Sequence, residues 1–335
     1  MGGIIKKRVL EMDVVRVVSI VAVIVLHVSA IVLYRCTPYS TTYDITFFFN
    51  QLSRFSVPAF IAVSGMGLTI NYKKDSSYSE FIVKRLLKIV PQYILWCILY
   101  ILIITKNFNI YSDLNDMVYG NVFYHFYFVP LIIEFYIIFP FIYKFIGKRW
   151  WLFFSFFITV FFLIYFYYFK RGAEELWFWN KKNLCYWLFY FSLGGYMGKN
   201  IEIISKKLNK YKYIILIMLL LSIFIILYNF ISGNQYNKDI DYITTFQRPA
   251  VLVYSTLFIL FIFSLKWKKG FFMDIIKYIS GVSYDIYLCQ SGILYLYGQY
   301  YTEKYGSMGN IHFFLSGFIV TFFGAIVLNK LKKIL

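Results

Sequence analysis

Long apolar runs, separated by short basic or polar connections, recur along the whole chain of 335 residues. Most runs approach the 20 or so residues that an α-helix needs to cross the hydrocarbon core of a bilayer. They do not alternate apolar and polar residues as strands of a membrane barrel do. The pattern predicts an all-α, polytopic membrane protein of about ten transmembrane helices. The expected spans are 14–33, 45–70, 89–105, 123–143, 150–169, 183–198, 213–231, 248–265, 279–297 and 311–329.

The basic residues show how these helices would cross the membrane. Most of the 34 Lys and Arg residues fall in alternate connections, beginning with "KKR" before the first run. Cytoplasmic loops are the ones that carry such an excess, so we expect both termini in the cytoplasm. The formal net charge of +18 is then explained by topology, and it predicts no nucleic-acid partner.

Composition narrows the class further. Hydrophobic residues make up 60% of the chain and charged residues only 15%, which is too little charge for a soluble domain of this length. We therefore expect a single transmembrane domain over residues 1–335, without a soluble extracytoplasmic domain. The four cysteines are scattered and make neither a metal-binding spacing nor an obvious disulfide pair, so no metal is expected.

The first apolar run carries an ionisable residue near each end, Arg16 and His27. Eleven residues make three helical turns plus about 20°, so both side chains lie on one stripe, roughly 16 Å apart. Asp13, three residues before Arg16, extends this stripe. Arg16 could be an interfacial residue that reaches water beside Asp13. His27 is too deep for that, and intramembrane ionisable groups face a cavity or a partner. A neutral imidazole there could accept a proton.

The second run, "DITFFFNQLSRFSVPAFIAVSGMGLTI", carries Arg54 about 13 Å deep, near the depth of His27. Gln51 lies on the same helical face, and Pro58 favours a kink. Arg54 could serve chemistry or a structural ion pair. Ser64 and Gly65 allow a close approach of either a neighbouring helix or a ligand.

Other polar residues complete a sparse interior. Lys84, Arg85 and Lys88 precede the third run and could contact lipid headgroups or the phosphates of a donor. His125 and Glu134 lie in the fourth expected span, and Asp285 lies in the ninth, which is polar enough to line a cavity. His125 could also be an interfacial residue. Glu134 needs a partner in so apolar a run, and Arg54 is the expected one.

At these positions the chain resembles the membrane-bound acyltransferase-3 family. The matching segments cover roughly the first 140 residues and residues 280–290, with Tyr127 and Gln290 where the family has Trp and His. They are Asp13, Arg16 and His27; Arg54, Phe55, Val57, Pro58, Ser64 and Gly65; Lys84, Arg85, Lys88 and Pro91; His125, Phe128, Glu134, Tyr136 and Pro140; and "SYDIYLCQ". The resemblance implies transfer of an acyl group, usually acetyl, from cytoplasmic acyl-CoA to a hydroxyl of a cell-surface glycan or lipid-linked sugar. It also implies a multi-pass protein of the bacterial plasma membrane, in contact with membrane lipids.

These residues suggest a division of roles. Lys84, Arg85 and Lys88 would bind the donor phosphates, and the thioester arm would pass Arg16, Ser64 and Gly65. His27 would accept the proton of the acceptor hydroxyl, Arg54 would stabilise the oxyanion, and Asp13 would hold Arg16. The acceptor would be bound by His125, Glu134, Gln51 and Asp285. A transporter or flippase of a glycan or lipid intermediate, or a membrane sensor or assembly protein, remains an alternative.

Overall fold

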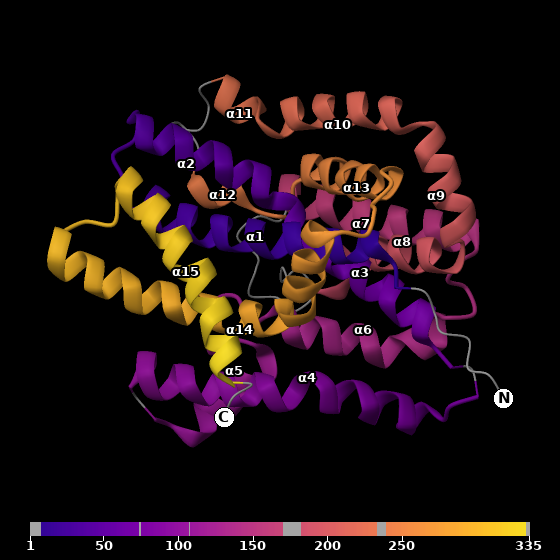
Figure 1. Cartoon of the computed structure of the whole chain (residues 1–335), viewed down its shortest axis with the longest axis horizontal. Coiled ribbons are helices and arrows are strands. Elements are labelled where there is room, and N and C mark those ends of the chain that lie inside the picture. Colours follow the sequence, from indigo (N-terminus) through magenta and orange to yellow (C-terminus); the bar gives the residue numbers. More distant parts are fainter. Residues whose placement is uncertain (1–7, 74, 107, 170–181, 233–238, 333–335) are drawn as a thin grey trace.

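The computed structural model describes residues 8–73, 75–106, 108–169, 182–232 and 239–332, and the regular structure in these ranges is helical. The helices are α1 (Leu10–Leu33), α2 (Thr41–Leu52), α3 (Ser56–Asn71), α4 (Tyr78–Tyr100), α5 (Ile110–Tyr119), α6 (Phe128–Ile142), α7 (Arg149–Phe169), α8 (Leu188–Lys199), α9 (Ile201–Lys210), α10 (Lys212–Ile226), α11 (Tyr228–Ile231), α12 (Ile240–Thr244), α13 (Pro249–Ser264), α14 (Phe271–Tyr305) and α15 (Ile311–Lys332). Helices α1, α4, α6 and α10 run nearly in the same direction across Figure 1, as in a membrane bundle.

The polytopic, all-helical class is confirmed. Six helical segments of the described chain are long and apolar enough to cross a membrane, or seven if α9 and α10, bent by 79°, form one span. Each of the ten expected spans coincides at least in part with a helix. The expected spans that are not among these six or seven segments coincide with helices that are short, such as α6 and α8, or too polar, such as α14. The pattern of apolar residues therefore predicts where these helices lie, but it does not determine how many of them cross the bilayer.

The second expected span is broken where its chemistry lies. Helix α2 ends at Leu52, one turn of 3₁₀-helix covers Ser53–Phe55, and α3 begins at Ser56. Pro58 falls in the first turn of α3, where a missing N–H costs no hydrogen bond. Arg54 therefore lies in the break itself, and its side chain is 6% exposed.

Helices α3 and α8 make the most extensive helix–helix contact among the described elements. Glycines allow it: a Cβ on Gly194 would lie 1.7 Å from the carbonyl oxygen of Ala62, and one on Gly65 would lie 2.2 Å from that of Phe191. Small residues at such crossings let helix backbones touch. Gly65 thus packs α3 against α8, which is the helix-packing alternative that the sequence left open.

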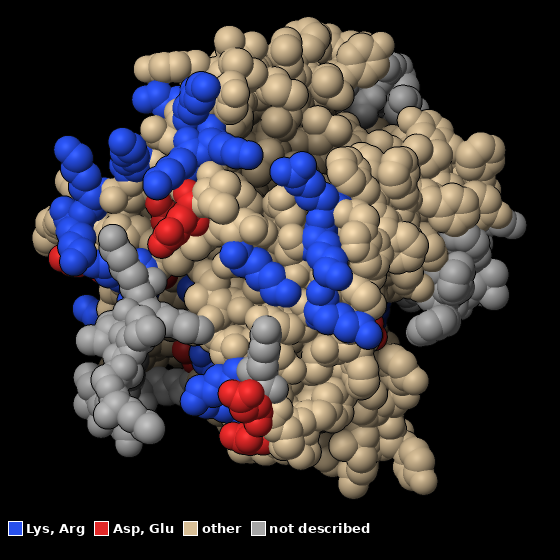
Figure 2. Space-filling model, turned by 90° about the vertical axis from the view of Figure 1, so that its right-hand side faces the viewer, with Lys and Arg blue, Asp and Glu red and all other residues tan. Residues whose placement is uncertain are grey.

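Charge is distributed unevenly over the surface. Figure 2 shows Lys and Arg side chains gathered on the side of the molecule where α9 lies in Figure 1. Several of the expected cytoplasmic basic residues, including Lys206, Lys207 and Lys210, belong to α9 itself. Helix α1 starts toward this side, so Arg16 lies nearer to it than His27 does.

Candidate active site

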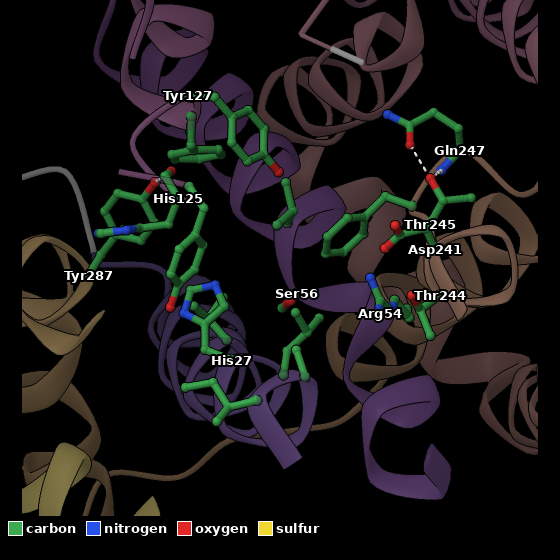
Figure 3. A pocket seen from close by; sticks show the side chains of 18 of the residues that line it. His27, Arg54, Ser56, His125, Tyr127, Asp241, Thr244, Thr245, Gln247 and Tyr287 are labelled. Carbon is green, nitrogen blue, oxygen red and sulfur yellow. Dashed lines mark hydrogen bonds between the residues drawn. The ribbon is translucent and has the colours of Figure 1, made fainter. Parts of the chain in front are cut away.

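A cavity of about 540 Å³ lies between α1, α3, α12 and the regions around the starts of α6 and α13. We call it the His27 cavity. His27, Arg54, His125, Tyr127 and Asp241 are among its lining residues, and Figure 3 shows their side chains arranged around one space. The structure therefore brings together three of the residues singled out in the sequence, from three separate apolar runs.

His27 is held through one ring nitrogen. Its Nδ1 lies 3.0 Å from Oε1 and 2.8 Å from Nε2 of Gln290, and 3.3 Å from Oγ of Ser291. The Tyr124 ring meets the imidazole edge-on, with centroids 5.0 Å apart. Within the described ranges Nε2 of His27 makes no hydrogen bond. When Gln290 accepts from Nδ1–H, Nε2 carries the lone pair and is available to a molecule in the cavity.

His125 stands beside His27, with ring centroids 5.9 Å apart. It precedes α6 and is only 2% exposed, and its ring nitrogens make no well-aligned hydrogen bond in the described part of the chain, although the backbone of Tyr287 and Leu288 lies beside the ring. The Tyr287 hydroxyl donates to the His125 carbonyl oxygen and so fixes the backbone there. A buried imidazole without a partner is costly unless a ligand supplies one.

The expected pairing of Arg54 with Glu134 is wrong. Nε of Arg54 donates to Oδ1 of Asn50 at 3.1 Å, Nη2 donates to the same atom, and the guanidinium lies 4.9 Å from the centre of the Phe246 ring. Glu134 is exposed, does not line either cavity, and has no ion pair among the described residues. His125 precedes α6, which begins at Phe128, and Glu134 lies on the exposed face of that helix.

Gln51 was expected to bind the acceptor, but it belongs to the cavity's supporting wall. Its amide nitrogen donates to the carbonyl of Ile243 at 3.2 Å, and its amide oxygen accepts from Nη2 of Arg248. Gln51 is fully buried and does not line the cavity. These bonds connect the end of α2 to the segment that carries Asp241.

A second cavity of about 480 Å³, the Arg16 cavity, lies further toward the start of α1. Four of the residues expected around the donor line it: Arg16, Ser64, Arg85 and Lys88. Asp285 also lines it, and so faces the expected donor side rather than the acceptor side. Nε of Arg85 is buried without a hydrogen-bond partner in the described chain.

Two expected donor residues lie outside this cavity. Lys84 is exposed and does not line it, although Arg85 and Lys88 of the same helix do. Gly65 does not line it either, since it faces Phe191 of α8. The residues of the expected donor site therefore differ in position. Some line the cavity, and others, such as Gly65, pack one helix against another.

Asp13 anchors the start of α1. Arg8 donates to its carboxylate from Nε at 2.6 Å and from Nη2 at 2.9 Å, and Ser280 donates at 2.7 Å. Nη1 of Arg16 lies 3.7 Å away, so the expected contact with Arg16 is present but is the longest of the set. Asp13 is 2% exposed, and its main effect is to join α1 to α14.

Several cavity residues carried no recognisable sequence signal. Asp241, Thr244, Thr245 and Gln247 line the His27 cavity from a short segment that contains α12. Gln290 was noticed only as a departure from the family's histidine, yet it contacts His27 directly. A contact 263 residues apart in sequence has no local pattern that could reveal it.

The two cavities, the buried imidazoles and the bundle define a helical membrane protein with an enclosed polar site. A family model described as an acyltransferase domain matches residues 9–330, so the chain belongs to the acyltransferase-3 family. It is a multi-pass membrane member of that family.

Proteins similar to this chain include several named "Probable poly-beta-1,6-N-acetyl-D-glucosamine export protein". One from Staphylococcus aureus is 26% identical over 302 residues, covering 86% of this chain and 83% of the relative. One from Staphylococcus epidermidis is 39% identical over 108 residues, covering 32% of this chain and 29% of the relative. No solved structure matches the chain.

Proposed function

We propose that this protein transfers an acyl group, most simply acetyl, from acyl-CoA to a hydroxyl of a polysaccharide or lipid-linked sugar at the bacterial plasma membrane. One observation carries the proposal: His27, held at Nδ1 by Gln290, lines a cavity that meets a second, basic cavity. Membership of the acyltransferase-3 family supports the reaction class, and the names of the relatives support a polysaccharide acceptor.

The Arg16 cavity suits the donor. CoA carries several phosphate charges, and guanidinium and ammonium groups bind phosphate through charge-assisted hydrogen bonds. Arg16, Arg85 and Lys88 supply such groups, and the buried Nε of Arg85 has an unused N–H. The basic face in Figure 2 supports placing this end of the bundle in the cytoplasm, where acyl-CoA would enter.

The chemistry then follows from the His27 ring. Nε2 accepts the proton of the acceptor hydroxyl while the oxygen attacks the thioester carbonyl carbon. The resulting tetrahedral oxyanion collapses, the carbon–sulfur bond breaks, and the departing CoA thiolate takes the proton back from His27. Arg54 faces the same cavity from the other side in Figure 3 and provides positive charge for the oxyanion.

The acceptor would occupy the remainder of the His27 cavity. His125 offers a buried imidazole without a well-aligned hydrogen bond, and Tyr127, Asp241 and Thr244 supply hydroxyl and carboxylate groups along the wall. Hydroxyls of a sugar both donate and accept hydrogen bonds, so a wall with both kinds of group is suited to them. These residues replace Glu134 and Gln51 as the proposed acceptor contacts.

Glycan export is a second candidate, favoured by the name of the relatives. A transporter would move its substrate without consuming acyl-CoA. The match to an acyltransferase domain over residues 9–330 favours acyl transfer.

The test is release of free CoA from acetyl-CoA by the protein in liposomes, with and without a β-1,6-linked N-acetylglucosamine oligosaccharide. We expect release that depends on the oligosaccharide, with the acetyl group recovered on it. His27→Ala should lower the rate by roughly 10²–10⁴-fold. His312→Ala, an exposed residue at the start of α15, is the matched control and should remain active. Oligosaccharide movement without CoA release would favour export and reject acyl transfer.

A further inference from the structure

Three aromatic residues line both cavities: Phe60 of α3, Phe128 of α6 and Tyr287 of α14. Among the described residues, these three alone line both cavities. The three rings touch one after another. The centroids of Phe60 and Phe128 are 6.2 Å apart with an interplanar angle of 61°, and those of Phe128 and Tyr287 are 5.5 Å apart with an interplanar angle of 58°. They form a bent partition between the two spaces.

Helix α3 shows how the cavities are stacked on this partition. Val57 lines the His27 cavity, Phe60 lines both, and Ser64 lines the Arg16 cavity. These residues follow one another along one helical face at intervals of three and four. The rise from Val57 to Ser64 is about 10 Å, with the Phe60 ring between them.

The members of the partition are held differently. Tyr287 is 8% exposed, and its hydroxyl is bonded to the His125 carbonyl, so this ring is fixed. Phe60 and Phe128 are only partly buried and have no polar atom to anchor them. An aromatic ring that merely filled the core would be covered on both sides, whereas these two rings face a cavity on each side.

We propose that Phe60, Phe128 and Tyr287 form the passage through which the acyl end of the donor reaches His27, and that Phe60 and Phe128 limit the size of that acyl group. The inference rests on the proposed function, because it takes the phosphates of CoA to be held in the Arg16 cavity. The thioester must then cross the partition to meet Nε2 of His27. A two-carbon acyl group needs the smallest displacement of the rings, and each further methylene needs more.

The test uses cysteines on either side of the partition, Val57→Cys and Ser64→Cys, and bromoacetyl-CoA as the probe. A cysteine thiolate displaces bromide from the acetyl carbon, forming a carbon–sulfur bond and leaving CoA attached to the protein. Labelling therefore reports where the acyl end travels and needs neither an acceptor nor catalysis by His27. The protein with its natural cysteines gives the background, and excess free CoA should compete.

Phe60→Trp should slow labelling at position 57 by about tenfold or more while changing labelling at position 64 by less than about twofold. Phe60→Ala should speed labelling at position 57, which keeps the test decisive if the larger ring disturbs folding. Equal labelling at position 57 with Phe60, Phe60→Trp and Phe60→Ala would reject the proposed passage and leave the proposed donor site standing. Failure of bromoacetyl-CoA to label position 64 would overturn the donor site and the proposed function with it.

A second measurement concerns size. In the transfer assay, Phe60→Ala and Phe128→Ala should raise the rate with butyryl-CoA relative to acetyl-CoA by about tenfold, since two methylenes no longer meet the rings. Tyr287→Phe keeps the ring and loses only the bond to the His125 carbonyl, so it should retain the natural preference for acetyl-CoA even if the overall rate falls. An unchanged preference in both alanine variants would reject the size limit.

Discussion

Gln290 of α14 contacts Nδ1 of His27 of α1, with its amide oxygen 3.0 Å and its amide nitrogen 2.8 Å from the ring nitrogen. Gln290 is fully buried, and its amide nitrogen also donates to Oγ of Ser291. The amide thus orients the imidazole and leaves Nε2 toward the cavity. In this chain a glutamine therefore orients the proposed general base by hydrogen bonding.

Removing this hydrogen bond should reduce the rate of transfer rather than donor binding. For Gln290→Leu we expect kcat to fall by roughly 10–100-fold with KM for acetyl-CoA nearly unchanged, because only the orientation of the base is lost. Gln290→His should restore much of the rate, since an imidazole can also contact Nδ1. The measurement is steady-state release of CoA. A rise in KM with an unchanged kcat would show that Gln290 does not position His27.

The donor site predicts a difference between neighbouring basic residues of α4. Arg85→Ala and Lys88→Ala should each raise KM for acetyl-CoA by about tenfold, because each removes a charge-assisted contact to phosphate. Lys84→Ala is the matched control and should have little effect, since Lys84 is exposed and outside the Arg16 cavity. A comparable rise in KM in all three variants would indicate that the basic surface attracts the donor in general, without a defined phosphate site.

The buried carboxylate of Asp13 should contribute more to the free energy of unfolding than the exposed carboxylate of Asp274. Asp13→Asn weakens contacts to Arg8, Arg16 and Ser280 at a buried position, and should lower the free energy of unfolding by about 1–3 kcal/mol. Asp274→Asn breaks an ion pair with Lys277, but Asp274 is 69% exposed, so the loss should stay under about 1 kcal/mol. Thermal unfolding in detergent measures both. Equal losses would show that burial of Asp13 has no energetic consequence.

Two glycines should respond oppositely to the same substitution. Gly65→Ala places a Cβ 2.2 Å from the Phe191 carbonyl oxygen, so α3 and α8 must separate and the melting temperature should fall. Gly281→Ala meets nothing within 4 Å on α14, and should be neutral or stabilise by up to about 1 kcal/mol. The melting temperatures of the two purified variants check this. A stable Gly65→Ala protein would contradict the close approach of α3 and α8.

Local pattern predicted the helices well because membrane helices need only long apolar runs. It also identified His27, Arg54 and His125, since ionisable groups are conspicuous in such runs. It failed at Glu134, which lies on the exposed face of α6, and at Gln51, which is bonded to Ile243 and Arg248 outside the cavity. Helical periodicity cannot assign faces when the helix starts later than expected or breaks, as it does at Arg54.

The sequence by itself determined an all-helical membrane protein with an imidazole at bilayer depth and basic residues toward one side. It could do so because spanning length, charge asymmetry and isolated polar residues are properties of single segments. Only the tertiary structure decided that Gln290 contacts His27, that Gly65 meets a neighbouring backbone, and that two cavities meet at three aromatic rings. Such contacts depend on how helices distant in the chain pack and rotate against one another, which no single segment encodes.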